Sequence, residues 1–325
     1  MLKAVAQKEW RITLEREFSL VRKTGGVASF KETRAFAALL GKMKDKIEKL
    51  NGIDEECGAN SIEIKFPLIR RQDIAPVVQS FKSAVNELAE TMAFSVIWTN
   101  QRPSDMVEMH PDPAHQPVFF PGLEDTWLYT NAMHIHFEIP RNVSPYMYNQ
   151  MNAVAPWFVM NTAEGEYDRL NAISRMANQA GDLYLPQDIH TEADYYELCA
   201  SAWEKFRKGI PAMKNADLVL SEFNAWNKQK IFHQARIRPD FELPNGNISL
   251  EFRPISGVAD TEKEIMICEA AVYAFWESID LPRIISMDEV RPFYLHPTKE
   301  SEAYAVAREF VQGTYFKNTR SYIIE

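Results

Sequence analysis

The sequence has little cysteine and no long apolar run, and each shortage excludes a class of protein. Three cysteines in 325 residues, Cys57, Cys199 and Cys268, are an odd number at wide spacing and include no CxxC pair. A disulfide scaffold or a zinc framework is therefore not expected, and a nucleophilic Cys57 is a weaker alternative to a structural thiol. No segment approaches the roughly 18 apolar residues of a membrane span, and MLKAVAQKEW contains no signal-peptide core. These absences predict a cytoplasmic protein with reduced cysteines.

Basic residues are also in short supply. There are 36 lysines and arginines against 45 aspartates and glutamates, so the formal net charge is -9. This balance lacks the positive field that a nucleic-acid backbone or an anionic membrane requires, and we expect neither as a partner. The 46% hydrophobic content is that of an ordinary globular chain without a Gly/Ser linker, which predicts one domain over residues 1–325. The oligomeric state is left open, a homo-oligomer included.

Apolar residues at spacings of three and four predict helices in six segments. The pattern is clearest between residues 30 and 51, where Phe36, Leu40, Met43 and Ile47 share one helical face. The predicted helices cover residues 30–51, 73–93, 144–161, 192–209, 260–280 and 299–313.

Four other segments alternate with period two, which predicts strands with one apolar and one ionisable face. Such strands fit an antiparallel sheet packed by helices on one side and open on the other, an α+β fold. The ionisable faces carry Thr13, Glu15, Glu17 and Ser19; Ser61, Glu63 and Lys65; His134, His136 and Glu138; and Ser249, Glu251 and Arg253.

The ionisable faces are unusually rich in carboxylate and imidazole. Taken alone, Glu15 and Glu17 read as the solvated edge of a strand, and His134 and His136 as a polar cross-strand pair. Glu251 with Arg253 would ordinarily be a surface ion pair. The joint pattern favours another interpretation, because like charges that face each other across strands repel unless a cation lies between them. Oxygen-rich ligands of this kind favour magnesium over zinc.

Taken in chain order, the strand segments also resemble a known family. They read RITLEREFSLV, NSIEIKFP, NAMHIHFEIP and ISLEFRPISG, and resemble the metal-binding strands of the glutamine synthetase and glutamate-cysteine ligase superfamily. The compact carboxylate-amine ligase branch is the most similar. NAISRMANQ resembles the family's S-x-R segment and ARIRPDF its R-P element. The resemblance implies a curved antiparallel sheet forming a funnel for ATP and two or three magnesium ions, with manganese as an alternative metal.

The resemblance implies five metal ligands in two groups. Glu17 and Glu63 would hold the ion on the acceptor side, whereas Glu15, His134 and Glu251 would hold the ion that bridges the ATP phosphates. The implied reaction phosphorylates a carboxylate, with the γ-carboxylate of glutamate as the leading candidate, before an amine or amino acid attacks the acyl phosphate.

Five further residues receive roles from the same resemblance. Arg253 would contact the transferring phosphoryl group, and His136 would lie close to the substrate, so both are catalytic candidates. Arg175 and Arg238 match positions that contact nucleotide or phosphate, and Lys65 is a third candidate for cofactor binding.

The chain departs from the family pattern near two of these positions. Glu138 stands where the compact ligases tend to have glycine, and Pro254, Ile255 and Ser256 follow Arg253 where an acid is usual. Nothing that resembles the small N-terminal domain of glutamine synthetases precedes Trp10, so we expect an amino acid or another amine in preference to ammonia. Two alternatives therefore stay open: a noncatalytic descendant that binds nucleotide or amino acid, and a metal-dependent hydrolase built on the histidine pair.

Overall fold

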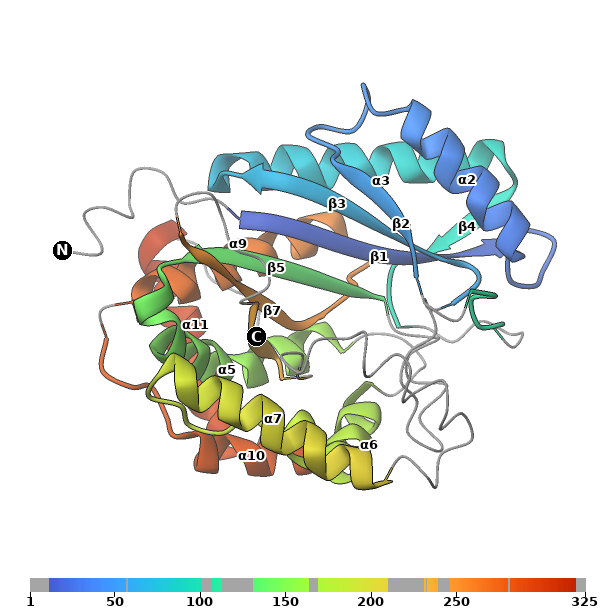
Figure 1. Ribbon diagram of the computed structural model, residues 1–325. Helices are drawn as coiled ribbons and strands as arrows, with labels where there is room; N and C mark the ends of the chain where they lie inside the picture. Colours follow the sequence, from blue (N-terminus) through green and yellow to red (C-terminus); the bar gives the residue numbers. More distant parts are fainter. Residues whose placement is uncertain are drawn as a thin grey trace.

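The computed structural model describes residues 12–56, 58–100, 107–112, 131–163, 169–209, 231, 233–238, 246–279 and 281–319. These residues form one sheet and a set of helices (Figure 1). The strands are β1 (Ile12–Arg22), β2 (Gly52–Glu55), β3 (Ser61–Ile69), β4 (Phe94–Ile97), β5 (Ala132–Ile139), β6 (Ala235–Arg238) and β7 (Ile248–Ser256). The α-helices are α2 (Phe30–Lys42), α3 (Ile74–Thr91), α5 (Ser144–Thr162), α6 (Arg169–Ala180), α7 (Glu192–Gly209), α9 (Thr261–Ser278), α10 (Met287–Leu295) and α11 (Glu302–Thr319).

The seven strands form an open sheet in the order β2-β3-β1-β5-β7-β6, and β4 adds to β1. Every strand pair described is antiparallel. The four strands predicted from alternation are β1, β3, β5 and β7, which lie next to one another in the middle of the sheet. The predicted mixture of helices and an antiparallel sheet is therefore confirmed, whereas the curved funnel stays a prediction.

The apolar faces of the central strands pack against helices. Leu14, Ile64, Ile135 and Phe252 are fully buried and belong to one core with residues of α3, α5 and α9. In Figure 1, α3 and α9 lie behind the sheet and α5 lies below it. The ring of Phe137 stacks on Phe275 of α9 at 4.1 Å between centroids. Full burial of each such side chain stabilises the fold by about 1.5–3 kcal/mol. Because the apolar faces of the strands pack against the helices, the ionisable faces lie on the opposite side of the sheet.

The helix predicted over residues 30–51 is too long. Ser29 caps α2 and Glu32 completes its capping box, but the helix ends at Lys42 and turns follow. Lys49 has a positive φ of 56°, which helices do not accept, and Gly52 already begins β2. Ile47 is nevertheless buried in the core, as the apolar spacing predicted, although it lies in the turns that follow α2.

A bulge interrupts the pairing of β5 with β7 beside the ionisable face. Met133 pairs with Ile255 and Ile135 pairs with Phe252, so Arg253 and Pro254 together face the single residue His134. Proline cannot donate a ladder hydrogen bond, and a bulge is where a sheet tolerates it. The extra residue in β7 bends this strand next to Arg253.

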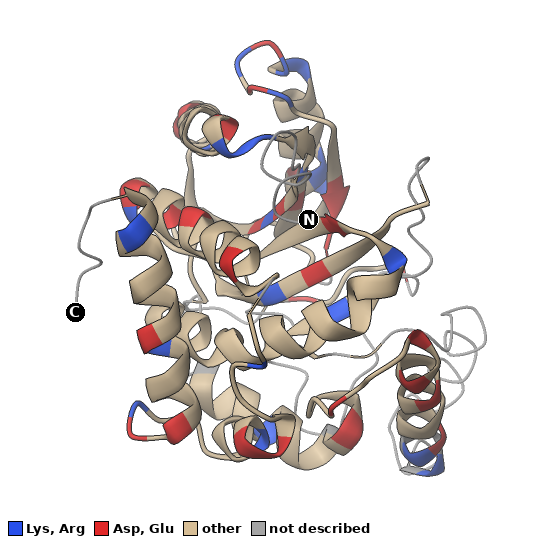
Figure 2. Ribbon diagram, turned by 90° about the vertical axis from the view of Figure 1, so that its left-hand side faces the viewer, with Lys and Arg blue, Asp and Glu red and all other residues tan. Residues whose placement is uncertain are grey.

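None of the described helices is both long and apolar enough to cross a membrane. Figure 2 shows acidic and basic residues close together on strands and helices alike.

Candidate functional site

The strand register brings the ionisable faces of β1, β3, β5 and β7 into one cluster. Glu17 pairs with Glu63 across β1 and β3, and Glu15 pairs with His134 across β1 and β5. His136 pairs with Glu251 across β5 and β7. Residues separated by more than 230 positions in the sequence therefore share one face of the sheet.

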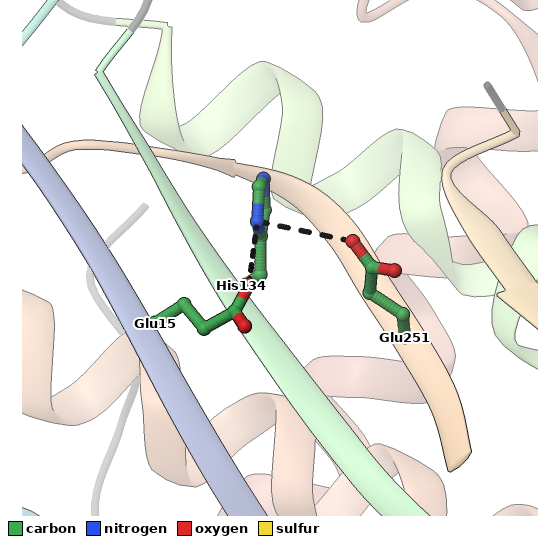
Figure 3. Close-up of side chains that lie close together, drawn as sticks. All are labelled: Glu15, His134 and Glu251. Atoms are coloured by element: carbon green, nitrogen blue, oxygen red, sulfur yellow. Dashed lines mark hydrogen bonds and ion pairs between the residues drawn. The ribbon is translucent and has the colours of Figure 1, made fainter. Parts of the chain in front are cut away.

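His134 lies at the centre of the cluster and is common to two groups of potential metal ligands. One group is Glu15, His134 and Glu251, and the other is Glu17, Glu63 and His134; in each, the ligand atoms lie within 4.8 Å of one another. Figure 3 shows the imidazole of His134 between the Glu15 and Glu251 carboxylates, with Nδ1 3.4 Å from Glu15 Oε2 and 3.9 Å from Glu251 Oε1. These are the residues named as ligands from the sequence.

The donor set fits hard divalent cations. Ligand atoms on opposite sides of such an ion lie about 4 to 5 Å apart. The ligand atoms of each group lie within 4.8 Å of one another, close enough to share one ion. Among the described residues, Glu15, Glu17 and Glu63 are paired with histidine or lysine and with no arginine, unlike Glu251. A metal ion at these groups would be held by carboxylate oxygen and imidazole nitrogen.

Glu63 is buried and lies close to other carboxylates. It is 5% exposed, and burial, followed by the charges of Glu56, Glu15 and Glu17, raises its pKa to about 9. Lys65 Nζ lies 2.8 Å from Glu63 Oε2, but Lys65 is one third exposed and also pairs with Asp54, so its charge offsets only part of the repulsion. A bound cation would relieve this repulsion and deprotonate Glu63.

Glu56 is a site residue that sequence reasoning missed. It follows β2 and precedes Ser61, the start of β3, and its charge acts on Glu63 more strongly than those of Glu15 and Glu17. The signal was available in the segment GIDEECGANSIEI, where two short alternating runs flank a turn. Recognising it requires the β2–β3 hairpin, because only the antiparallel pairing brings Glu56 near Glu63.

Arginines surround the fully buried carboxylate of Glu251. Arg236 forms a fork with Nε 2.7 Å from Oε2 and Nη2 2.9 Å from Oε1, and Arg238 Nη1 lies 2.9 Å from Oε2. Arg253 Nη1 donates to Oε1. Burial alone would raise the pKa of Glu251, but the charges of Arg236 and Arg253 hold it well below its usual range. Three guanidiniums against one carboxylate leave an excess of positive charge that suits phosphate oxygens.

The second histidine of β5 is oriented by two groups. His136 Nδ1 lies 3.1 Å from Ser249 Oγ of β7, and Nε2 lies 3.2 Å from Glu15 Oε2 of β1. Burial would raise the pKa of Glu15, but its hydrogen bonds with His134 and His136 lower the pKa below its usual range. His136 and Arg253 therefore lie in the same cluster as the metal-ligand candidates.

Arg175 lies on α6, outside the sheet, and its contact with nucleotide or phosphate stays a prediction. It is half-buried on α6, a helix that packs against α10, and within the described residues it forms no ion pair with the cluster. Cys199 and Cys268 are buried free thiols, and burial raises the pKa of Cys199 to about 12, as expected for structural cysteines. Cys57 lies outside the described residues.

Comparison with family models finds no match, and neither does comparison with curated proteins. Among solved structures, a novel glutamine synthase homolog matches 98% of this chain and 68% of its own, at 14% identity and a TM-score of 0.44. A bifunctional glutathione synthetase from Pasteurella multocida matches at 14% identity and a TM-score of 0.49, and apo GmaS at 13% and 0.46. The chain covers 45% of the Pasteurella protein and 72% of GmaS, which in turn cover 97% and 99% of this chain. Because identities and TM-scores of this size assign no activity, function depends on the residues of this chain.

Proposed function

We propose that this protein, as a single domain, is an ATP- and magnesium-dependent ligase that joins a carboxylate, with the γ-carboxylate of glutamate as the leading candidate, to an amine through an acyl phosphate. The observation that carries the proposal is the pair of ligand groups sharing His134, one of them beside three arginines. The sequence resemblance described above supports the same assignment.

The cluster separates charge in the way that phosphoryl transfer requires. Glu15, Glu17 and Glu63 lie on β1 and β3, whereas the arginines lie on β6 and β7 with Glu251. Carboxylates would hold divalent cations on one side, and guanidinium forks would bind phosphate oxygens on the other. Bound cations would neutralise the phosphates and the charge that develops on the transferring group.

Each residue of the cluster then has a task that matches its position. Glu17 and Glu63 would hold one cation, on the acceptor side, and Glu15, His134 and Glu251 would hold another, on the side of the phosphates. Arg253, Arg236 and Arg238 orient the phosphate chain, with Arg253 at the group transferred. His136, which lies beside Ser249 and Glu15, would contact the substrate.

The proposed reaction accounts for the need for ATP. A carboxylate anion is a poor electrophile, so one of its oxygens must first attack the terminal phosphorus and release ADP. The amine then attacks the acyl carbon, and phosphate leaves with the oxygen that the carboxylate supplied. This sequence forms one amide bond and consumes one ATP.

The testing experiment offers glutamate, Mg-ATP and a set of amino acids and amines to the purified protein, and measures ADP and product mass. Hydroxylamine in place of the amine should trap the acyl phosphate as a hydroxamate. Glu17→Gln should abolish both products, and the matched control is Glu32→Gln, in an exposed capping box at the start of α2. Wild-type protein that forms neither ADP nor hydroxamate with any carboxylate would refute the ligase.

One observation favours a second candidate, a noncatalytic descendant that binds nucleotide. Both oxygens of Glu251 already accept hydrogen bonds from arginines, so this carboxylate is satisfied without a metal. This candidate predicts ATP binding without ADP formation. A hydrolase would instead act without ATP, so ATP dependence separates it from the ligase.

A further inference from the structure

One charged residue of β1 points away from the candidate site, into the core. Arg16 stands between Glu15 and Glu17 in the sequence and has no exposed surface. Its Nε lies 3.0 Å from Glu264 Oε1 and its Nη2 lies 3.3 Å from Glu264 Oε2. Lys82 of α3 reaches the same carboxylate, with Nζ 3.0 Å from Oε2. Arg16, Glu264 and Lys82 form a buried triad between the sheet and the helices.

Stability alone does not explain this triad. Desolvating charges costs several kcal/mol per ion, and apolar side chains of similar volume are often as stabilising as a buried ion pair. The triad has a second set of contacts, however, with the backbone that carries the candidate site. Arg16 Nη1 donates to the carbonyl of Glu17 and lies 3.5 Å from that of Ala132, and Nη2 lies 2.9 Å from that of Trp98.

These contacts involve the backbone groups that determine the orientation of the Glu17 side chain. The Glu17 carboxylate accepts a hydrogen bond from the Ala132 N–H at 2.8 Å. Arg16 therefore holds the backbone of Glu17 and the backbone of the residue to which the Glu17 side chain is anchored. Ala132 begins β5, which carries His134 two residues later.

The chain after β7 is also packed closely around the guanidinium. A Cβ on Gly257 would lie 1.7 Å from the Trp98 carbonyl oxygen and 2.7 Å from Arg16 Nη1, so only glycine fits there. The Gly257 N–H donates to the Asn131 carbonyl at 2.6 Å. Segments of β1, β5 and β7 thus converge on Arg16 from the side opposite the cluster.

We propose that Arg16 is a positioning residue: its guanidinium, held by Glu264, sets β1 against β5 so that Glu17 and His134 are spaced to share a cation. The proposal rests on the proposed function, because it presupposes cation binding at that group. Lys82 has a different role, since it donates to the carbonyls of Val258 and Ala259 at 2.8 Å each and secures Glu264.

The two cations of the triad provide a matched pair of variants. Arg16→Met leaves the neutral pair Lys82 and Glu264, and Lys82→Met leaves the neutral pair Arg16 and Glu264. Mn²⁺ alone, titrated by electron paramagnetic resonance, measures binding without turnover, and urea unfolding in EDTA measures stability. We expect Arg16→Met to weaken the affected Mn²⁺ site about tenfold or more and Lys82→Met to change it less than twofold, although both lose stability.

The outcomes separate this proposal from the proposed function. Unchanged Mn²⁺ affinity in Arg16→Met, or equal losses in both variants, would overturn the positioning role while wild-type binding upholds the metal site. Wild-type protein that binds no Mn²⁺ would overturn both. If Arg16→Met does not fold, Arg16→Lys replaces it, because lysine keeps the charge beside Glu264 but cannot span three carbonyls. A loss of about threefold is then expected, and wild-type affinity would refute the proposal.

Discussion

Glu63→Gln tests the cluster most directly, because it removes a charge and keeps the shape. Without metal, burial and the neighbouring carboxylates raise the pKa of Glu63 to about 9, against 4.5 for the ordinary group. Between these values the folded protein binds a proton that the unfolded chain lacks. The stability that Glu63 contributes is therefore complete below pH 4.5 and is lost as the pH rises toward 9.

The stability lost at a given pH follows from the distance between that pH and the ordinary pKa of Glu63. At pH 7.5 the ordinary pKa lies three units away, and each unit corresponds to about 1.36 kcal/mol, so the upper value is about 4 kcal/mol. Relaxation of the protein and entry of water around a buried charge reduce this value. We expect Glu63→Gln to raise the free energy of unfolding in EDTA by about 2 kcal/mol and the Tm by about 3 °C.

In saturating Mg²⁺ the wild type should be more stable than Glu63→Gln, the reverse of the order in EDTA. A ligand at a hundred times its Kd stabilises the folded state by about 2.7 kcal/mol, and the variant lacks one carboxylate ligand. Wild-type protein should therefore gain much more stability from Mg²⁺ than Glu63→Gln does. Ligase activity should fall strongly in the variant, although its metal-free fold is more stable.

Urea unfolding between pH 6.5 and 9, in EDTA and in Mg²⁺, provides the measurement. Wild-type stability in EDTA should fall by up to about 1.36 kcal/mol per pH unit, whereas Glu63→Gln should be nearly flat. Glu32→Gln is the control, and it should keep the wild-type pH dependence. The reasoning fails if Glu63→Gln is less stable than wild type in EDTA at pH 7.5, or if its pH dependence is unchanged.

Three other predictions follow from the same structure. Arg253→Lys keeps the charge but loses the fork, so kcat for ADP formation should fall about a hundredfold to a thousandfold, with a smaller change in ATP affinity; weaker ATP binding with kcat intact would contradict this role. His134→Ala should raise the magnesium requirement, whereas His136→Ala should act mainly on turnover, and magnesium titrations showing the reverse would exchange the two assignments. Burial lowers the pKa of His233 to about 4, against 6.5 for the ordinary group, so about 3 kcal/mol of stability should be lost as the pH falls from 6.5 to 4. His233→Gln should remove that loss in urea unfolding, and an unchanged pH profile would argue against it.

The sequence alone was sufficient to predict the central strands and the residues of the ionisable face. Strand alternation is a local property of the backbone, so Glu15, Glu17, Glu63 and His134 could be placed on one side of their strands without knowing the pairing. Glu251 followed in the same way. That these five residues bind metal is a proposal, and their gathering on neighbouring strands was established only by the pairing order β3-β1-β5-β7.

Only the tertiary structure identified the residues whose role depends on distant partners. Alternation places Arg16 on the apolar face of β1, where an unpaired charge would be excluded, and its partner Glu264 is 248 residues away. Glu56 and Arg236 enter the site through strand pairing, which side-chain periodicity does not encode. The bulge beside Arg253 likewise depends on the register of β5 with β7. Periodicity reports which face a side chain occupies, whereas long-range packing decides what that side chain meets.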